Sequence, residues 1–144
     1  MEFLVERIKH KDYAEVVQVW EASVRATHDF LTEADIQYFK PLILNQYLDA
    51  VDLFCINDQN NILGFLGVDD QKIEMLFVLP DATGRGIGKA LCEYAINHLN
   101  VYEVDVNEDN SNAVQFYKHM GFVVASRSPL DNTGKPFPIL HMKL

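Results

Sequence analysis

The chain contains 144 residues, and its 21 acidic residues against 12 Lys and Arg give a formal net charge of −9. That length fits one domain, and we expect a single domain over residues 1–144 because 49% of the residues are hydrophobic, enough for one core. Phosphate backbones and anionic lipids repel an acidic chain, which argues against general binding to nucleic acid or to a membrane. A local basic patch could still bind one anion.

The cysteines and the N-terminus bear on where the protein resides. Cys55 and Cys92 are the only two cysteines, and each lies in an apolar stretch that favours a buried free thiol over a disulfide. Free thiols suit a reducing cytosol. Residues 1–7 lack the basic start and apolar run of a signal peptide, and no stretch approaches the ~18 apolar residues that span a bilayer. We therefore expect a cytoplasmic protein.

The first third of the chain predicts a strand followed by two helices. Alternation over residues 3–8 is typical of a short strand. Two candidate capping boxes mark the helix starts: Asp12 with Glu15, and Thr32 with Asp35. Apolar residues at helical spacing follow each of them. Pro41 is expected to kink or split the second helix.

The remaining sequence predicts strands interrupted by two helices. Three runs joined by short polar turns, residues 52–56, 62–68 and 72–78, favour an antiparallel meander. A helix from residue 87 is followed by a strand, a helix and two further strands at residues 101–106, 113–120, 122–125 and 139–142. Asn110 or Asn112 can cap the second of these helices, and Gly121 can end it. The order predicts an α/β fold with a mixed sheet, in which a crossover joins residues 72–78 to residues 101–106.

Between a predicted strand and its helix lies a glycine-rich loop, Gly84-Arg85-Gly86-Ile87-Gly88. Free amides and the helix dipole favour a phosphate at such a helix start, and glycine lets the backbone approach it closely. Residues 82–92 include Arg85 and Lys89 but no acid, so this is the local basic patch allowed for above.

Neither of two common nucleotide-binding motifs matches this loop. The third glycine comes one residue too early for a Rossmann turn, and Ala90 stands where a P-loop needs Ser or Thr. The alternative is a turn that only packs helix against strand.

Residues 76–91 resemble the acyl-CoA binding motif of the GNAT acetyltransferase superfamily. The second half of that pattern is similar to Asn107, Asn110, Ala113, Phe116, Tyr117, Gly121 and Phe122. Residues 20–31 and 127–138 look like the first helix and C-terminal loop of a bacterial subgroup. The resemblance implies a GNAT-like fold with a mixed central sheet of six to seven strands flanked by four helices. It also implies direct transfer of acetyl from acetyl-CoA to an amine.

The resemblance further implies site roles. Backbone amides of the loop would hold the coenzyme pyrophosphate, at Gly84, Arg85, Gly86, Ile87, Gly88 and Lys89. The strand backbone would pair with the pantetheine arm, at Leu76, Phe77 and Val78. Asn110 matches a position that contacts the coenzyme, and a plain helix cap is compatible with that. Thr83 departs from the usual Arg or Gln, so a side-chain contact to the pyrophosphate is expected to be missing.

Tyr117 matches the general acid that protonates the departing coenzyme, the alternative being a core aromatic. The general base stays open between Glu74 and His28. Glu74 is expected to share a strand face with Leu76 and Val78, and an acid on an apolar strand can have a raised pKa. His28 is a natural base near pH 7 and could instead orient the acceptor or cap its helix. The other histidines show no metal-ligand spacing, so no metal is expected.

The acceptor amine is not named by any motif. Acidic residues near the second half of the pattern could attract a cationic amine, although a solvated acidic face explains them equally: Glu103, Asp105, Glu108 and Asp109. The rival function is a non-catalytic sensor of acetyl-CoA that regulates a partner. Either a monomer or a homodimer is compatible with the sequence.

Overall fold

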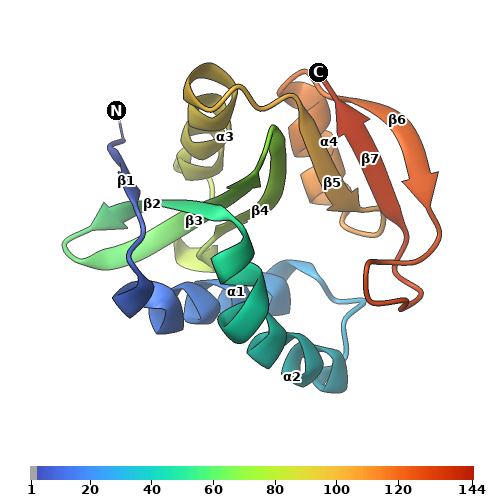
Figure 1. Ribbon diagram of the computed structural model, residues 1–144, viewed down its shortest axis with the longest axis horizontal. Coiled ribbons are helices and arrows are strands. Elements are labelled where there is room, and N and C mark those ends of the chain that lie inside the picture. The colour runs from blue at the N-terminus through green and yellow to red at the C-terminus, as the bar shows by residue number, and fades with distance from the viewer. Residues whose placement is uncertain (1–2) are drawn as a thin grey trace.

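Seven strands form one mixed sheet in the computed structural model, which describes residues 3–144 (Figure 1). Residues 1–2, on which part of the signal-peptide argument rests, lie outside the described residues. The strands are β1 Val5–Arg7, β2 Asp52–Asp58, β3 Asn61–Asp69, β4 Lys72–Val78, β5 Glu103–Asn107, β6 Val123–Ser128 and β7 Ile139–Lys143. Over the same residues there are four α-helices: α1 Tyr13–Thr27, α2 Glu33–Leu42, α3 Ile87–His98 and α4 Ser111–His119. The predicted fold class is confirmed.

The sheet runs in the order β1-β2-β3-β4-β5-β7-β6. Neighbours pair antiparallel except β4 and β5, which are parallel and joined by the predicted crossover through α3. The sequence did not predict that β7 inserts between β5 and β6.

Strands β4 and β5 pair at only two positions, Lys72 with Glu103 and Ile73 with Val104. Beyond Ile73 they separate, as Figure 1 shows at the centre of the view. A β-bulge in the β3–β4 pairing lies at the same place, because Gly67 pairs with Met75 while Val68 pairs with Ile73. A Cβ on Gly67 would lie 3.0 Å from Val51 Cγ2 and 3.3 Å from Met75 Cβ. The tight packing therefore favours glycine opposite the bulge.

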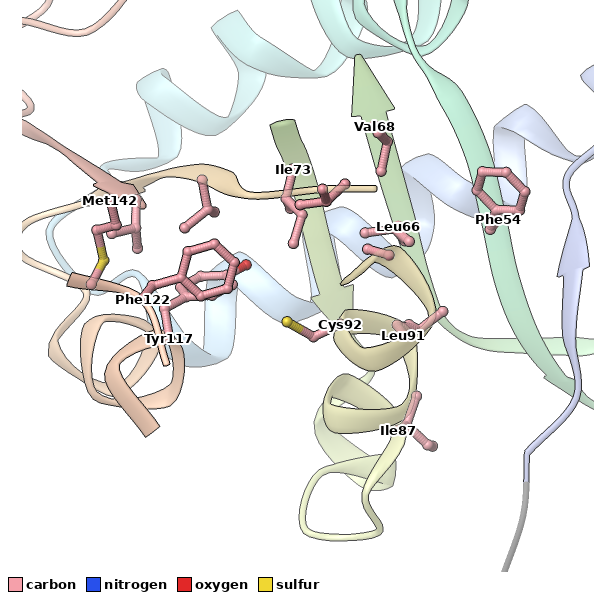
Figure 2. Close-up of a cluster of buried hydrophobic side chains, with 14 of the residues drawn as sticks. Phe54, Leu66, Val68, Ile73, Ile87, Leu91, Cys92, Tyr117, Phe122 and Met142 are labelled. Carbon is pink, nitrogen blue, oxygen red and sulfur yellow. The ribbon is translucent and has the colours of Figure 1, made fainter. Parts of the chain in front are cut away.

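Two hydrophobic clusters fill the two faces of the sheet. One contains side chains of α1 and α2, including Val16, Trp20 and Ile36, packed on Phe65 of β3. The other lies under α3 and α4, and its members are shown in Figure 2. Cys92 and Cys55 are both buried free thiols, as expected. No helix of residues 3–144 is long and apolar enough to cross a membrane.

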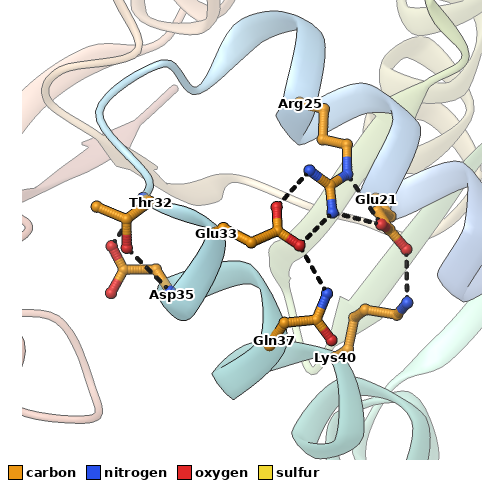
Figure 3. Close-up of polar contacts among 7 residues, drawn as sticks. All are labelled: Glu21, Arg25, Thr32, Glu33, Asp35, Gln37 and Lys40. Atoms are coloured by element: carbon orange, nitrogen blue, oxygen red, sulfur yellow. Dashed lines mark hydrogen bonds and ion pairs between the residues drawn. The ribbon is translucent and has the colours of Figure 1, made fainter.

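One of the two predicted capping boxes forms. Thr32 Oγ1 accepts from the amide of Asp35, and Asp35 Oδ2 accepts from the amide of Thr32, at 3.1 and 3.0 Å (Figure 3). The prediction for Asp12 was wrong, since its side chain makes no capping bond. Its intended partner Glu15 instead accepts from the amide of Ile62, at 2.8 Å. That bond ties α1 to β3.

Ion pairs between α1 and α2 hold the second helix in place. Arg25 bridges Glu21 and Glu33, and Lys40 lies 2.7 Å from Glu21 (Figure 3). Pro41 lies inside α2 and does not split it into two helices: after Leu42 the chain stays helical and changes to a π-helical turn over Ile43–Tyr47. These contacts set the position of the wall that α2 contributes to the site described below.

The capping box makes a testable contribution to stability. Thr32→Ala removes the hydroxyl that accepts from the amide of Asp35, and we expect a loss of about 1 kcal/mol in the free energy of unfolding. Urea unfolding followed by circular dichroism measures it. Ser126→Ala, on exposed β6, is the matched control and should change the value by less than about 0.5 kcal/mol. Equal losses in the two variants would contradict the assignment.

Candidate active site

A cavity of about 590 Å³ lies where β4 and β5 diverge. Its floor comes from β4 and β5, one wall from α1 and α2, and another from α4. The loop between β6 and β7 closes it with Asp131, Asn132, Thr133 and Phe137. Lys135 of that loop lies 3.7 Å from Asp35 and over the ring of Tyr38, which anchors the loop to α2.

Charge and hydrophobicity are unevenly distributed in the cavity lining. Four acidic residues line it, Asp69, Glu74, Asp105 and Asp131, and none of its described lining residues is Lys or Arg. The walls between them are apolar and aromatic: Trp20, Val24, Leu31, Phe39, Ile43, Met75, Leu76 and Phe77. Such a lining suits a cation on an aliphatic stem.

Glu74 lies at the bulge, directly after the last β4–β5 pair. The bulge breaks the alternation on which its expected orientation rested, because Ile73 packs with Leu76 and Val78 in one cluster while Met75 and Phe77 belong to the other. The expectation that Glu74 shares a face with Leu76 and Val78 assumed unbroken alternation, which the bulge interrupts beside Glu74, and Glu74 lines the cavity together with Leu76. Burial raises the pKa of Glu74, and Lys72, at 3.6 Å, opposes that rise.

Lys72 also lies 2.5 Å from Asp105, which connects the cavity to a chain of polar groups across the sheet. Asp105 Oδ1 lies 2.6 Å from His141 Nδ1, and His141 Nε2 lies 2.7 Å from Ser128 Oγ. The sequence suggested Asp105 only as part of an acidic face. Its neighbours Lys72, His141 and Ser128 were missed, because they come together only through strand pairing.

His28 follows the last residue of α1 and is buried, with 7% of its surface exposed. Its Nδ1 lies 2.8 Å from Thr27 Oγ1, and its Nε2 lies 3.3 Å from Nδ2 of Asn110. Asn110 caps α4, since its Oδ1 accepts from the amide of Ala113 at 3.2 Å. Burial lowers the pKa of His28 to about 4, against the opposing charge of Asp29.

Tyr117 lies on α4 and contributes to both the core and the cavity. Its ring packs edge-on against Phe116 and Phe122, and the residue is 5% exposed. Figure 2 shows its hydroxyl directed away from Met142, on the side of Ile73 and Cys92. No hydrogen bond joins that hydroxyl to another group within residues 3–144, and the residue lines the cavity. Burial raises the pKa of Tyr117, so the hydroxyl stays protonated at neutral pH.

The glycine loop offers a row of free amides. Gly84 and Gly86 have φ of +80° and +85°, a conformation that favours glycine, and Gly86 begins α3. In the part of the chain that the structure describes, no acceptor takes the amide hydrogens of residues 84–89. Thr83 is exposed, and its hydroxyl donates to the Pro80 carbonyl at 2.8 Å.

The predicted site residues divide between these two places. The cavity brings together Glu74, Leu76, Phe77, His28, Asn110 and Tyr117. Val78 and the loop residues Gly84, Arg85, Gly86, Ile87, Gly88 and Lys89 do not line it. Gly88 packs closely between β4 and α4, because a Cβ there would lie 3.7 Å from Val78 and 3.8 Å from Phe116. No group of His, Cys, Asp and Glu within residues 3–144 could hold a metal ion.

Comparison with known proteins identifies the family. Residues 11–144 match the acetyltransferase (GNAT) domain. The chain belongs to the GNAT family. It is 37% identical to the peptidyl-lysine N-acetyltransferase YjaB of Salmonella typhimurium over 96% of this chain and 95% of that protein. Because the family match and the N-acetyltransferase relatives agree, the protein is an N-acetyltransferase that uses acetyl-CoA and an amine acceptor.

Solved structures agree with the fold. The solution structure of apo YjaB from Escherichia coli matches with a TM-score of 0.88 at 35% identity, covering 99% of this chain and 97% of that one. A Thermoplasma acidophilum PaiA N-acetyltransferase in complex with coenzyme A matches with a TM-score of 0.72 at 21% identity, covering 100% of both chains. The family match and the N-acetyltransferases named YjaB favour the enzyme over the non-catalytic sensor.

The environment of Glu74 generates a prediction. Lys72→Met removes the positive charge that opposes the rise in the pKa of Glu74, so that pKa should rise further. Carboxyl-carbon NMR of the ¹³C-labelled protein, titrated with pH, measures the shift. Lys143→Met is the matched control, because Lys143 pairs with Glu103, which does not line the cavity. A lower pKa of Glu74 in Lys72→Met, or an equal change in the two variants, would show that Lys72 does not influence the pKa of Glu74.

Proposed function

We propose that the acceptor is the side-chain amine of a lysine in a peptide or protein, and that residues 1–144 form one catalytic domain. YjaB relatives are named peptidyl-lysine N-acetyltransferases. The observation that carries the proposal is the cavity lining, four carboxylates with no described Lys or Arg among apolar walls. A lysine would place its methylene stem against the apolar walls and its ammonium near the carboxylates.

The coenzyme would bind along the free edge of β4 and end at the glycine loop. After Ile73, the edge of β4 that faces β5 has no strand partner, which leaves backbone groups of Leu76, Phe77 and Val78 for the amide groups of pantetheine. The free amides of residues 84–89 would hold the pyrophosphate at the start of α3. Because Thr83 bonds to the Pro80 carbonyl, binding there would rest on amides and on Arg85 and Lys89.

Glu74 is the stronger candidate for the general base. It lines the cavity at the bulge, and its raised pKa makes it a better proton acceptor than an exposed carboxylate. Both ring nitrogens of His28 already have hydrogen-bond partners. In the proposed reaction Glu74 takes a proton from the ammonium, directly or through water. The amine nitrogen then attacks the thioester carbonyl, and the carbon–sulfur bond breaks.

Tyr117 would protonate the departing thiolate. Within residues 3–144 its hydroxyl makes no hydrogen bond, the residue lines the cavity, and the raised pKa keeps the proton on the hydroxyl at neutral pH. Cys92, the nearest thiol, is a poor substitute because burial raises its pKa to about 12 and it does not line the cavity. Asn110 would lie beside the pantetheine arm, on the wall that α4 contributes.

The acceptor assignment is tested with defined peptides. With acetyl-CoA, a peptide that carries one lysine and a blocked N-terminus should release free thiol and gain one acetyl group on the ε-amine. Mass spectrometry locates that group. The same peptide with lysine already acetylated, and a free-N-terminus peptide without lysine, are the controls. Thiol release with the latter alone would show that the acceptor is an α-amine.

Tyr117→Phe tests the general acid. The change removes only the hydroxyl, so the ring contacts with Phe116 and Phe122 remain. We expect kcat to fall by roughly 100-fold or more, because general acid catalysis typically contributes that much. The Kd for acetyl-CoA, measured by calorimetry, should stay within about twofold because no coenzyme contact is lost. Unchanged kcat would remove Tyr117 from the mechanism.

A further inference from the structure

We propose that His28 is a positioning residue, whose Nε2 lone pair fixes the side-chain amide of Asn110 and thereby the start of α4. The inference rests on the proposed function for its kinetic consequences, but its hydrogen-bond geometry can be tested without turnover. It replaces the role of general base for this histidine.

The tautomer of His28 follows from counting hydrogens. Thr27 Oγ1 lies 2.8 Å from the Ser23 carbonyl, to which it donates its one hydrogen. The same oxygen lies 2.8 Å from His28 Nδ1 and can only accept there. Nδ1 therefore carries the proton of the neutral ring, and Nε2 carries the lone pair.

The orientation of Asn110 is fixed from its other end. Its Oδ1 accepts from the Ala113 amide, so the amide nitrogen must be the group that faces His28. That nitrogen donates to the Nε2 lone pair at 3.3 Å. In this series of hydrogen bonds from Ser23 through Thr27, His28 and Asn110 to Ala113, each bond has a defined donor and acceptor. Exchanging donor and acceptor in any one of them would break another.

The bond joins two residues of the cavity lining that lie 82 residues apart in sequence. His28 follows α1, the acceptor-side wall, while Asn110 starts α4, which carries Ala113 and Tyr117 on the cavity lining. Tyr117 lies seven residues after Asn110, two helical turns along the same helix. Fixing Asn110 therefore fixes the N-terminal end of α4, the helix on which Tyr117 lies.

The surroundings of His28 hold the ring still. Its centroid lies 5.2 Å from that of Phe30 and 6.2 Å from that of Phe77. A general base needs a lone pair free to take a proton, and here the one lone pair of the neutral ring already accepts a hydrogen bond from Asn110. If Nε2 were protonated, its N–H and the N–H of Asn110 would both be donors pointing at each other, and the hydrogen bond would be lost. The low pKa of His28 agrees with a ring that stays neutral.

Two amide variants separate positioning from base catalysis. The Gln side chain places its terminal atoms near Nε2 of the histidine, whereas Asn reaches only the Nδ1 position. His28→Gln can therefore keep an acceptor for Asn110, and His28→Asn cannot. Neither amide titrates. We expect His28→Asn to lower kcat/KM for acetyl-CoA about tenfold, near the worth of one hydrogen bond, and His28→Gln to recover most of that loss.

The coupling is measured in a double-mutant cycle with Asn110→Ala. Since both substitutions break the same bond, the double variant His28→Asn/Asn110→Ala should be little worse than Asn110→Ala alone. His119→Ala, on the exposed end of α4, controls for the loss of an imidazole. Thermal unfolding of every variant separates lost folding from lost activity. A Gln variant as impaired as Asn, with loss of the acidic limb of the pH–rate profile, would restore His28 as the base.

Nitrogen NMR of the ¹⁵N-histidine-labelled protein tests the geometry by itself. We expect a His28 signal of the Nδ1–H tautomer that stays neutral at pH 5.5. An Nε2–H tautomer would overturn the proposal even if the enzyme is active. The expected tautomer in a protein that acetylates no amine would uphold the bond and refute the proposed function instead.

Discussion

The separation of β4 from β5 is the constraint on which the site depends. Parallel strands normally keep pairing, and here the ladder stops after Ile73. The bulge at Glu74 supplies the cause, because a bulge bends its strand and increases its twist. Gly67, opposite the bulge, leaves room for it, since a side chain at this position would come too close to Val51 and to the Cβ of Met75. One extra residue in β4 therefore opens the sheet.

The same bulge has three chemical consequences. It leaves the β4 edge beyond Ile73 without a strand partner, it reverses the faces of the residues that follow, and it brings Glu74 to the cavity. The cavity is then closed by groups distant in sequence, above all by His28 with Asn110 and by Lys135 with Asp35. The backbone of β4 thus opens the sheet, and contacts between side chains connect the segments on either side of the opening.

The sequence correctly predicted those local features whose interacting residues are close together along the chain. The Thr32–Asp35 box, the glycine loop before α3 and the cap at Asn110 each use residues within a few positions of one another. The Asp12–Glu15 box failed for the converse reason. Glu15 has a better partner in the amide of Ile62, 47 residues away, and local spacing carries no information about that strand.

The sequence singled out residues that line one cavity, but it did not predict how they are arranged there. Glu74, His28, Asn110 and Tyr117 do meet in one cavity. The face of Glu74 could not be predicted, because strict alternation was assumed and the bulge depends on how β3 packs. The partner of His28 could not be predicted either, since nothing in either helix alone indicates that the end of α1 lies opposite the start of α4.

Charge is distributed so that two substrates of opposite sign can meet. A chain of net charge −9 repels an anionic coenzyme, and a row of backbone amides is a way to hold phosphate without adding many cations. The acid-free residues 82–92 provide that row, and the four carboxylates lie in the cavity instead. Lys72 limits their repulsion by holding Glu74 and Asp105 together. Because the anion and cation sites are joined by the free edge of β4, a thioester bound along that edge would point its acetyl group toward the carboxylates. The place where the sheet opens would thus set the orientation of the bound thioester relative to the acidic cavity.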